Sequence, residues 1–270
     1  MNELDKKIKQ SVNLIKTLDG LDPELAYSGG KDSDIILALA QLSGIRFFPI
    51  YKMTTIDPSG TIEHARKKGV EIRKPKLTFF QLIEKKGFPS RFARFCCSEL
   101  KEYKILDKCI LGIRAEESKA RKERYKEPTI CRIYNKKDRV EQFLPILYWT
   151  NKEVEEFVNY YHIDCHSLYY ENGKFNPNKR LGCLCCPLKS DRGLEDFKKN
   201  PRFVKQWIKH GQIWWDTHEN LKSKRLFSDI YELFACRTFY DRISDFCLNK
   251  EALIKTDWKK ELENYFNIEL

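Results

Sequence analysis

The run Ser28-Gly29-Gly30-Lys31-Asp32-Ser33 contains the residue types from which proteins build a phosphate site. Two adjacent glycines allow a tight turn and a close approach of the backbone to an anion. If a helix begins here, its free N–H groups and its dipole favour negative charge. Lys31 adds a mobile cation, Asp32 could hold a Mg²⁺ ion that bridges phosphates, and Ser28 and Ser33 add hydroxyl donors. The run matches neither the Walker pattern nor G-x-G-x-x-G.

Cysteines form the second chemical grouping. The chain has ten, and five of them lie in two tight clusters, Cys96-Cys97 and, after 85 intervening residues, Cys183-Leu184-Cys185-Cys186. In a chain of this size without a secretory signal, clustered cysteines more often hold metal or carry out redox chemistry than form disulfides. A CC pair and a CxxC pair together supply four thiolates, which suit a tetrahedral zinc ion or a 4Fe–4S cluster.

The elements that must position these groups alternate between strands and helices. Apolar runs predict strands at 24–27, 46–53, 70–73, 105–113 and 142–146. Helices are predicted at 3–18, 32–42 and 59–68, after a capping box at Thr78–Gln81, and from a capping box at Thr150–Glu153 to Tyr160. This alternation predicts an α/β fold with a doubly wound, mainly parallel sheet. Ligands bind such sheets at the carboxyl ends of the strands, where the glycine run lies.

The pattern changes after about Asp191, where only helical segments follow. The sequence therefore predicts a nucleotide-binding α/β domain with the cysteine cluster at 1–190 and a helical C-terminal region at 191–270. The tryptophans of this region are expected in its core rather than on a base-stacking platform.

Composition limits the partners and the location. The 270 residues are 41% hydrophobic and 33% charged, and no apolar run approaches the roughly 20 residues that span a bilayer. The polar segment Met1–Gln10 has no signal-peptide core, so we expect a cytoplasmic protein. Lys plus Arg number 50 against 39 Asp plus Glu, a net charge of +11. This surplus favours a polyanionic partner such as a nucleotide, tRNA or DNA, with a lysine-rich solubilising surface as the alternative.

The glycine run after the first predicted strand resembles the signature loop of the PP-loop ATP pyrophosphatases, which cleave ATP between the α and β phosphates. The CC…CxxC pattern is similar to that of the iron–sulfur adenylylsulfate reductases, within the phosphoadenylylsulfate (PAPS) reductase family. Three further segments resemble the family in the expected order: Leu111–Arg121, Pro145–Val154 and Ser167–Tyr170. The resemblance covers about residues 22–190 and implies an adenine nucleotide alpha hydrolase-like, Rossmann-like fold.

The resemblance also implies roles for individual residues. It assigns a 4Fe–4S cluster, with zinc as the alternative, to Cys96, Cys97, Cys183 and Cys186. The residues that it assigns to ATP are Tyr27, the loop 28–33, Tyr51, Lys52 and Met53 near the adenine, and Gly112 and Arg114.

The catalytic candidates that the resemblance implies are Lys31, Asp32, Arg114 and Arg121. The two arginines would bind the phosphates or the leaving pyrophosphate. Glu116 and Glu117 would orient these arginines or assist Mg²⁺; solvated surface charge is the alternative for Arg121 and the glutamates. Cys185 is an extra thiol, either structural, a replacement ligand or a sulfur carrier.

Two departures from the reductases change the expected function. The sequence contains no Glu-Cys-Gly-[Ile/Leu]-His motif, which carries the reductases' attacking cysteine, and it ends Asn264–Leu270. The loop 28–33 is intact, as suits ATP itself, whereas reductases usually carry a degenerate loop. We therefore expect an ATP pyrophosphatase that adenylylates a substrate for sulfur insertion, into nucleic acid, by DNA phosphorothioation or tRNA thiolation.

This expectation names ATP, Mg²⁺, the cluster and a cysteine desulfurase as sulfur donor, and it leaves open the acceptor and whether the protein is a homodimer. The first alternative is a phosphoadenylylsulfate or adenylylsulfate reductase that uses Cys185 or a partner's thiol. The second is a non-catalytic, nucleotide-sensing subunit of a DNA-modification or defence complex.

Overall fold

The computed structural model describes residues 2–134, 138–219, 222–240, 243–250 and 256–270. Spatial proximity groups them into two units that no single cut in the sequence separates. The first unit contains Met1–Met53, Asp57–Lys74 and Lys101–Gly182, and the second contains Thr54–Ile56, Pro75–Leu100 and Cys183–Leu270. A division into domains 1–190 and 191–270 stays a prediction.

A six-stranded sheet organises the first unit. Its strands are β1 (Glu24–Tyr27), β2 (Phe48–Lys52), β3 (Glu71–Arg73), β4 (Lys108–Leu111), β5 (Thr129–Tyr134) and β6 (Asp138–Phe143), in the order β3-β2-β1-β4-β6-β5. All neighbouring strands pair in parallel except β5 and β6. The strand order reverses beside β1, as in doubly wound sheets. The predicted α/β fold with a mainly parallel sheet is therefore confirmed.

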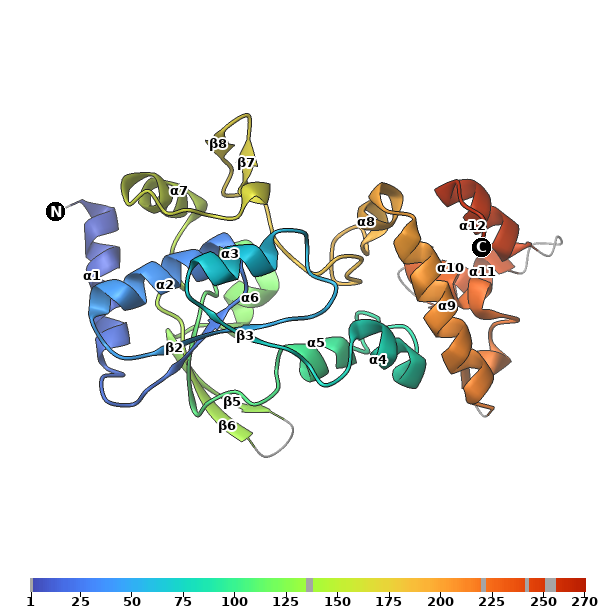
Figure 1. Ribbon diagram of the computed structural model, residues 1–270, viewed down its shortest axis with the longest axis horizontal. Coiled ribbons are helices and arrows are strands. Elements are labelled where there is room, and N and C mark those ends of the chain that lie inside the picture. Colours follow the sequence, from blue (N-terminus) through green and yellow to red (C-terminus); the bar gives the residue numbers. More distant parts are fainter. Residues whose placement is uncertain (1, 135–137, 220–221, 241–242, 251–255) are drawn as a thin grey trace. The chain divides into compact units, whose positions relative to one another are not determined.

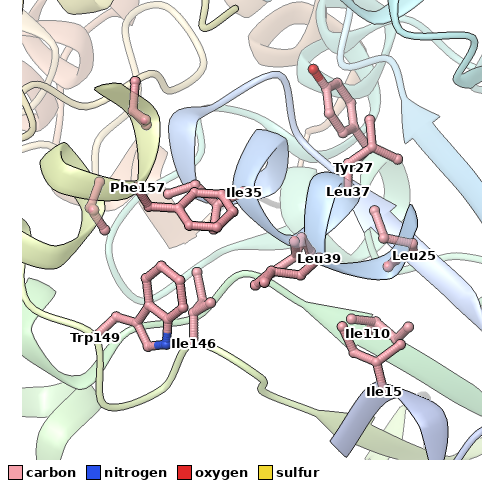
Figure 2. Packing of buried hydrophobic residues seen from close by; sticks show 14 of the residues in the cluster. Ile15, Leu25, Tyr27, Ile35, Leu37, Leu39, Ile110, Ile146, Trp149 and Phe157 are labelled. Carbon is pink, nitrogen blue, oxygen red and sulfur yellow. The ribbon is translucent and has the colours of Figure 1, made fainter. Parts of the chain in front are cut away.

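Helices from distant parts of the chain pack on this sheet. They are α1 (Glu3–Lys16), α2 (Lys31–Ser43), α3 (Thr61–Lys67) and α7 (Asn151–Tyr160). Helix α6 (Lys119–Arg124) belongs to the same unit but buries none of its side chains. Figure 2 shows how side chains such as Ile15, Ile35 and Phe157 gather in one core with Leu25 and Ile110 of the strands. Ser11 joins two parts of this core, because its hydroxyl donates to Pro145 O at 2.6 Å and accepts from the Trp149 indole at 3.2 Å.

The predicted strand at 142–146 is wrong in its second half. The sheet ends at Phe143, and the buried side chains of Leu144, Ile146 and Leu147 lie on a turn in which Leu147 N donates to Leu144 O. These residues are apolar because they are buried beneath the sheet edge. An apolar run alone does not distinguish a buried turn of this kind from a strand.

The second unit is helical and aromatic. Its helices are α4 (Phe79–Lys86), α5 (Phe95–Leu100), α8 (Leu194–Lys199), α9 (Arg202–Thr217), α10 (Ile230–Phe239), α11 (Ile243–Lys250) and α12 (Trp258–Phe266), drawn from teal to red in Figure 1. Phe79, Phe197 and Phe234 surround Trp207 at ring-centroid distances of 5.2–6.3 Å. Trp207 and Trp214 are buried and Trp215 and Trp258 pack against the same cluster, which confirms the tryptophans as core.

The capping boxes that open α4 and α7 are both present, at Thr78–Gln81 and Thr150–Glu153. In the segments that the structure describes, no helix is long and apolar enough to cross a membrane.

A buried ion pair joins two neighbouring strands of the sheet. Lys52 Nζ lies 2.8 Å from Glu24 Oε1, and both residues are buried. The second carboxylate oxygen of Glu24 accepts a hydrogen bond from Leu106 N at 3.2 Å. Because Glu24 is fully buried, its charge depends mainly on the contact with Lys52, while Arg73 acts on it at longer range.

We predict that Lys52→Ala destabilises the protein by about 3–5 kcal/mol, because it leaves the Glu24 carboxylate buried and unpaired. Arg46→Ala, which removes an equally charged partner from the exposed Asp22 at 3.6 Å, should cost about 0–1 kcal/mol. Urea unfolding of both variants measures the difference. Equal losses of unfolding free energy in the two variants would show that the buried ion pair stabilises the protein no more than the exposed one.

Candidate active site

The glycine loop lies where the strand order of the sheet reverses. It connects β1 to α2, and β1 lies between β2 and β4. The segment after β4, which begins at Gly112, leaves the sheet at the same edge, since β1 and β4 are parallel. The predicted loop and the second predicted nucleotide segment are therefore brought together at the position where doubly wound sheets bind ligands.

Only a glycine fits at position 29. Its φ of +76° lies in the left-handed region, and a Cβ there would lie 2.6 Å from Thr61 Cγ2. Gly30 precedes α2 in an extended conformation and caps it without a side chain. Ser33 closes the loop, because its hydroxyl donates to Gly30 O at 2.6 Å and its N–H donates to the same oxygen at 2.8 Å.

Lys31 and Asp32 stand side by side on the first turn of α2. Lys31 is only 1% exposed, and its Nζ lies 3.1 Å from Asp32 Oδ2, 3.4 Å from Lys179 O and over the Tyr169 ring. Burial lowers the pKa of Lys31 from 10.5, and Asp32 opposes this shift. The ammonium is held in a low-dielectric site where its attraction for an anion is strong.

Arg114 is fully buried and its guanidinium bonds to protein groups. Its Nε donates to Asp32 Oδ1 at 2.7 Å and its Nη2 to Asn151 Oδ1 at 2.8 Å. Its Nη1 lies 3.3 Å from both Glu116 Oε2 and Trp149 O. In this arrangement Arg114 fixes the Asp32 carboxylate, and the expected grip on a phosphate would require these bonds to be exchanged.

Arg121 belongs to a second ionic group at the same loop cluster. It pairs with the partly buried Glu117, which also lies 3.4 Å from Arg180. Burial and the nearby Arg180 lower the pKa of Arg121. The electrostatic influence of Arg180 extends to Lys31 as well. Arg180 was not among the predicted site residues, and its place in the sequence directly before the CxxC segment gave no distinct signal.

Gly112 and Tyr27 have structural roles in this arrangement. A Cβ at Gly112 would lie 2.8 Å from Asp32 O, so the glycine lets the end of β4 approach the start of α2. Tyr27 is buried in the core of the first unit (Figure 2), and its hydroxyl donates to Asp34, whose carboxylate lies 3.0 Å from His64 Nε2. A direct contact of the Tyr27 side chain with a nucleotide therefore has no support in this geometry.

The three residues expected near the adenine lie at and just after the carboxyl end of β2. Tyr51 is buried, Lys52 is engaged by Glu24, and Met53 is half-buried against the core. The Met53 N–H donates to Arg73 O at 3.0 Å. Because the Lys52 side chain is occupied, a contribution of this segment to nucleotide binding would fall mainly on its backbone.

The cysteines expected to hold metal all lie in the second unit. Cys96 and Cys97 begin α5, Cys183 and Cys186 lie on the turn before α8, and all four are partly exposed. Hydrogen bonding with Cys97, burial and the neighbouring Cys97, Cys186 and Cys183 raise the pKa of Cys96. The four thiols are therefore near enough to act on one another, although no three metal-ligating side chains among the described residues form a preassembled site. Bringing four thiolates together is unfavourable until a cation compensates their charge, so this donor set fits zinc or an iron–sulfur cluster.

Cys185 differs from these four in being 1% exposed. Its backbone is left-handed, with φ of +53°, and its N–H donates to Asp196 Oδ2 at 2.7 Å. A Cβ at Gly193 would lie 2.5 Å from Cys185 C, so the backbone of Cys185 packs directly on this glycine and leaves no room for a side chain there. Burial raises the pKa of Cys185. Of the three roles that the sequence left open, this geometry favours the structural one.

Comparison with known proteins identifies the family. The sequence profile described as the phosphoadenosine phosphosulfate reductase domain matches residues 22–189. No curated protein sequence matches the chain. Among solved structures, the U34-tRNA thiolase NcsA from Methanococcus maripaludis, with its 4Fe–4S cluster, is 15% identical and has a TM-score of 0.41, covering 81% of this chain and 82% of that chain. The NMN synthetase from Francisella tularensis is 12% identical with a TM-score of 0.40, covering 98% and 93%.

We predict that Gly29→Ala destabilises the protein more than Gly20→Ala does. Both glycines have φ near +75°, so both variants bear a left-handed alanine at a cost of about 1–2 kcal/mol. Only position 29 adds a clash with Thr61, since a Cβ at Gly20 meets nothing within 4 Å, and we expect about 1–3 kcal/mol more. Thermal unfolding gives the midpoint of each variant. Equal midpoints would show that a side chain at position 29 does not clash with Thr61.

Proposed function

We propose a function for this chain from the premise that it belongs to the phosphoadenosine phosphosulfate reductase domain family. The protein cleaves ATP to AMP and pyrophosphate and uses the AMP to activate an oxygen of a nucleic acid for replacement by sulfur. The observation that carries this proposal is the intact loop 28–33 at the reversal of strand order, with Lys31, Arg121 and Arg180 grouped around it.

The cations of this group suit a triphosphate better than a sulfonucleotide. Lys31 and the free N–H groups that start α2 would bind the β and γ phosphates, which only ATP offers. Arg121 and Arg180, both paired with Glu117, would stabilise the charge that collects on the departing pyrophosphate. Both arginines already lie within electrostatic range of the loop, since Arg121 interacts with Asp32 and Arg180 acts on Lys31.

Asp32 is the residue that would hold Mg²⁺. Its carboxylate lies on the first turn of α2, is partly exposed, and is oriented by Arg114. Mg²⁺ commonly binds through one or two carboxylates together with substrate phosphates and water, so a single aspartate fits. The ion would neutralise phosphate charge when ATP is bound.

The chemical sequence has two displacements. An oxygen of the acceptor attacks the α phosphorus of ATP, the bond to the bridging oxygen of the β phosphate breaks, and pyrophosphate leaves. The terminal sulfur of a persulfide supplied by a cysteine desulfurase then attacks the acceptor atom that bears the activated oxygen, and that oxygen leaves with AMP. A thiol reductant supplies two electrons that break the remaining S–S bond, which leaves the sulfur on the acceptor and frees the carrier thiol. Cys96, Cys97, Cys183 and Cys186 would hold the cluster, which, with a thiolate on each iron, would supply one-electron redox chemistry; zinc on the same thiols would be structural.

The experiment that tests this function supplies ATP, adenylylsulfate and phosphoadenylylsulfate separately, each with and without single-stranded DNA or tRNA. AMP, pyrophosphate and sulfite are measured. We expect AMP and pyrophosphate from ATP, increased by nucleic acid. Sulfite from either sulfonucleotide would identify a reductase instead, and ATP binding without turnover would identify a nucleotide sensor.

We predict that ATP affinity falls as the pH rises through the alkaline range below 10.5. The pKa of Lys31 is lowered from that value, so its ammonium loses its proton earlier than an ordinary lysine, and the attraction for phosphate is lost with it. Lys31→Arg keeps its charge throughout this range and should flatten the profile. Calorimetric titration at several pH values measures it, with the exposed Lys205→Arg as the control that retains the wild-type fall. A wild-type affinity that is constant over this range would contradict the assignment of Lys31.

We predict that Cys96→Ser and Cys186→Ser each lose most of the bound metal of anaerobically purified protein. Cys131→Ser, which alters an exposed thiol of β5 in the first unit, should keep it. Iron, sulfide and zinc analysis with visible absorbance measures the content. Colourless wild-type protein with about one zinc per chain would replace the cluster by zinc, and unchanged metal in both serine variants would exclude this site.

A further inference from the structure

A surface pocket of the second unit combines three arginines with two aromatic side chains, one exposed and one half-buried. Arg91 and Phe92 come from the segment before α5, Pro187 and Arg192 from the segment after the CxxC, and Arg237 and Tyr240 from the end of α10. None of these residues belongs to the nucleotide loop or to the expected metal ligands. The pocket therefore requires an explanation that the ATP site does not provide.

The charge of this pocket is only partly compensated. Arg91 donates to two backbone carbonyls, Pro187 O at 3.3 Å and Lys189 O at 3.1 Å. Arg192 donates to Thr238 O and Phe239 O, both at 2.9 Å. In the part of the chain that the structure describes, neither Arg91 nor Arg237 pairs with a carboxylate, and burial lowers the pKa of Arg237. Carbonyl groups orient the Arg91 guanidinium without neutralising it, so the charges of Arg91 and Arg237 attract anions to the pocket.

The aromatic residues make this anion site specific for a particular kind of ligand. Phe92 is 89% exposed, more than any other large hydrophobic residue described, and it follows Arg91 directly in the chain. Tyr240 lines the same pocket and is half-buried. The exposed ring of Phe92 beside these cations offers a free face on which a planar group can stack. Single-stranded nucleic acid supplies both partners, since its phosphates bind arginine and its bases stack on aromatic faces.

The pocket also adjoins the thiols along the chain on both sides. Pro187 follows Cys186 directly, and Arg91 lies five residues before Cys96. The two hydrogen bonds of Arg91 hold the carbonyls of Pro187 and Lys189, so the arginine fixes the segment that leaves the CxxC. A strand bound in the pocket would lie beside the segments that carry the thiols.

We propose that this pocket binds one nucleotide unit of a single-stranded nucleic acid, with the phosphate held by Arg91, Arg192 and Arg237 and the base stacked on Phe92. The inference rests on the proposed function, because it names the surface of the second unit that would receive the acceptor. A phosphate-free acidic peptide would satisfy the arginines but would leave Phe92 uncovered, and for this reason we favour nucleic acid.

The test measures binding of a fluorescent single-stranded DNA and an RNA of the same sequence by the full-length protein over a range of salt concentrations. We expect Phe92→Ala to weaken binding roughly tenfold with little change in salt dependence. Arg237→Gln should weaken it several-fold and reduce the slope of log affinity against log salt by about 1. Arg202→Gln, the same charge change on the exposed face of α9, should retain the wild-type slope and an affinity within about twofold.

The controls separate this inference from the proposed function. Phe92 is so exposed that its alanine variant should keep the wild-type unfolding midpoint. This variant therefore still tests the pocket if Arg237→Gln fails to fold. Wild-type affinity in both pocket variants, no wild-type binding, or equal competition by polyglutamate would overturn the pocket, even if ATP still yields pyrophosphate. Weakened binding in both variants supports the pocket, even if no pyrophosphate is released and the proposed function fails.

Discussion

The ion pair between Asp32 and Arg114 is the interaction on which the candidate active site depends. It joins the first turn of α2 to the segment that follows β4, at 2.7 Å. Since Arg114 is fully buried, its charge requires acidic and carbonyl partners, and Asp32, Glu116 and Trp149 O meet that requirement. The pair therefore holds the glycine loop and the segment that begins at Gly112 in one fixed relation without a ligand, and such preorganisation is what electrostatic catalysis needs.

The sequence predicts an element correctly where its hydrophobic periodicity and its end signals match the way in which the element packs in the fold. β1, the capping boxes of α4 and α7, and the helical character after Asp191 all follow from periodicity and end signals. Helix α6 was missed because its sequence, Lys119–Arg124, has no apolar face to give a period. Strand β5 was missed although β6, its antiparallel partner, follows it closely in the sequence, because a half-exposed strand at a sheet edge gives only a weak local signal.

The residues of the site show the same limit. The positions of Lys31, Asp32 and Gly29 followed from their types, because phosphate chemistry demands them. The burial of Arg114 by four protein partners, the pairing of Tyr27 with Asp34, and the part played by Arg180 depend on contacts between segments far apart in the chain. Spacing could gather the cysteines into two clusters, but only packing against Gly193 and the aromatic core distinguishes Cys185 from its neighbours.

The interleaving of the two units has a consequence for biosynthesis. All of the first unit lies before Cys183, whereas the second unit needs both Pro75–Leu100 and the chain from Cys183 onward. A ribosome thus completes the six-stranded sheet while Cys96 and Cys97 still lack the cysteines expected to share their metal. Delivery of iron or zinc to these thiols in the nascent chain would have to wait until the CxxC emerges, so maturation of the proposed metal centre would follow folding of the glycine loop.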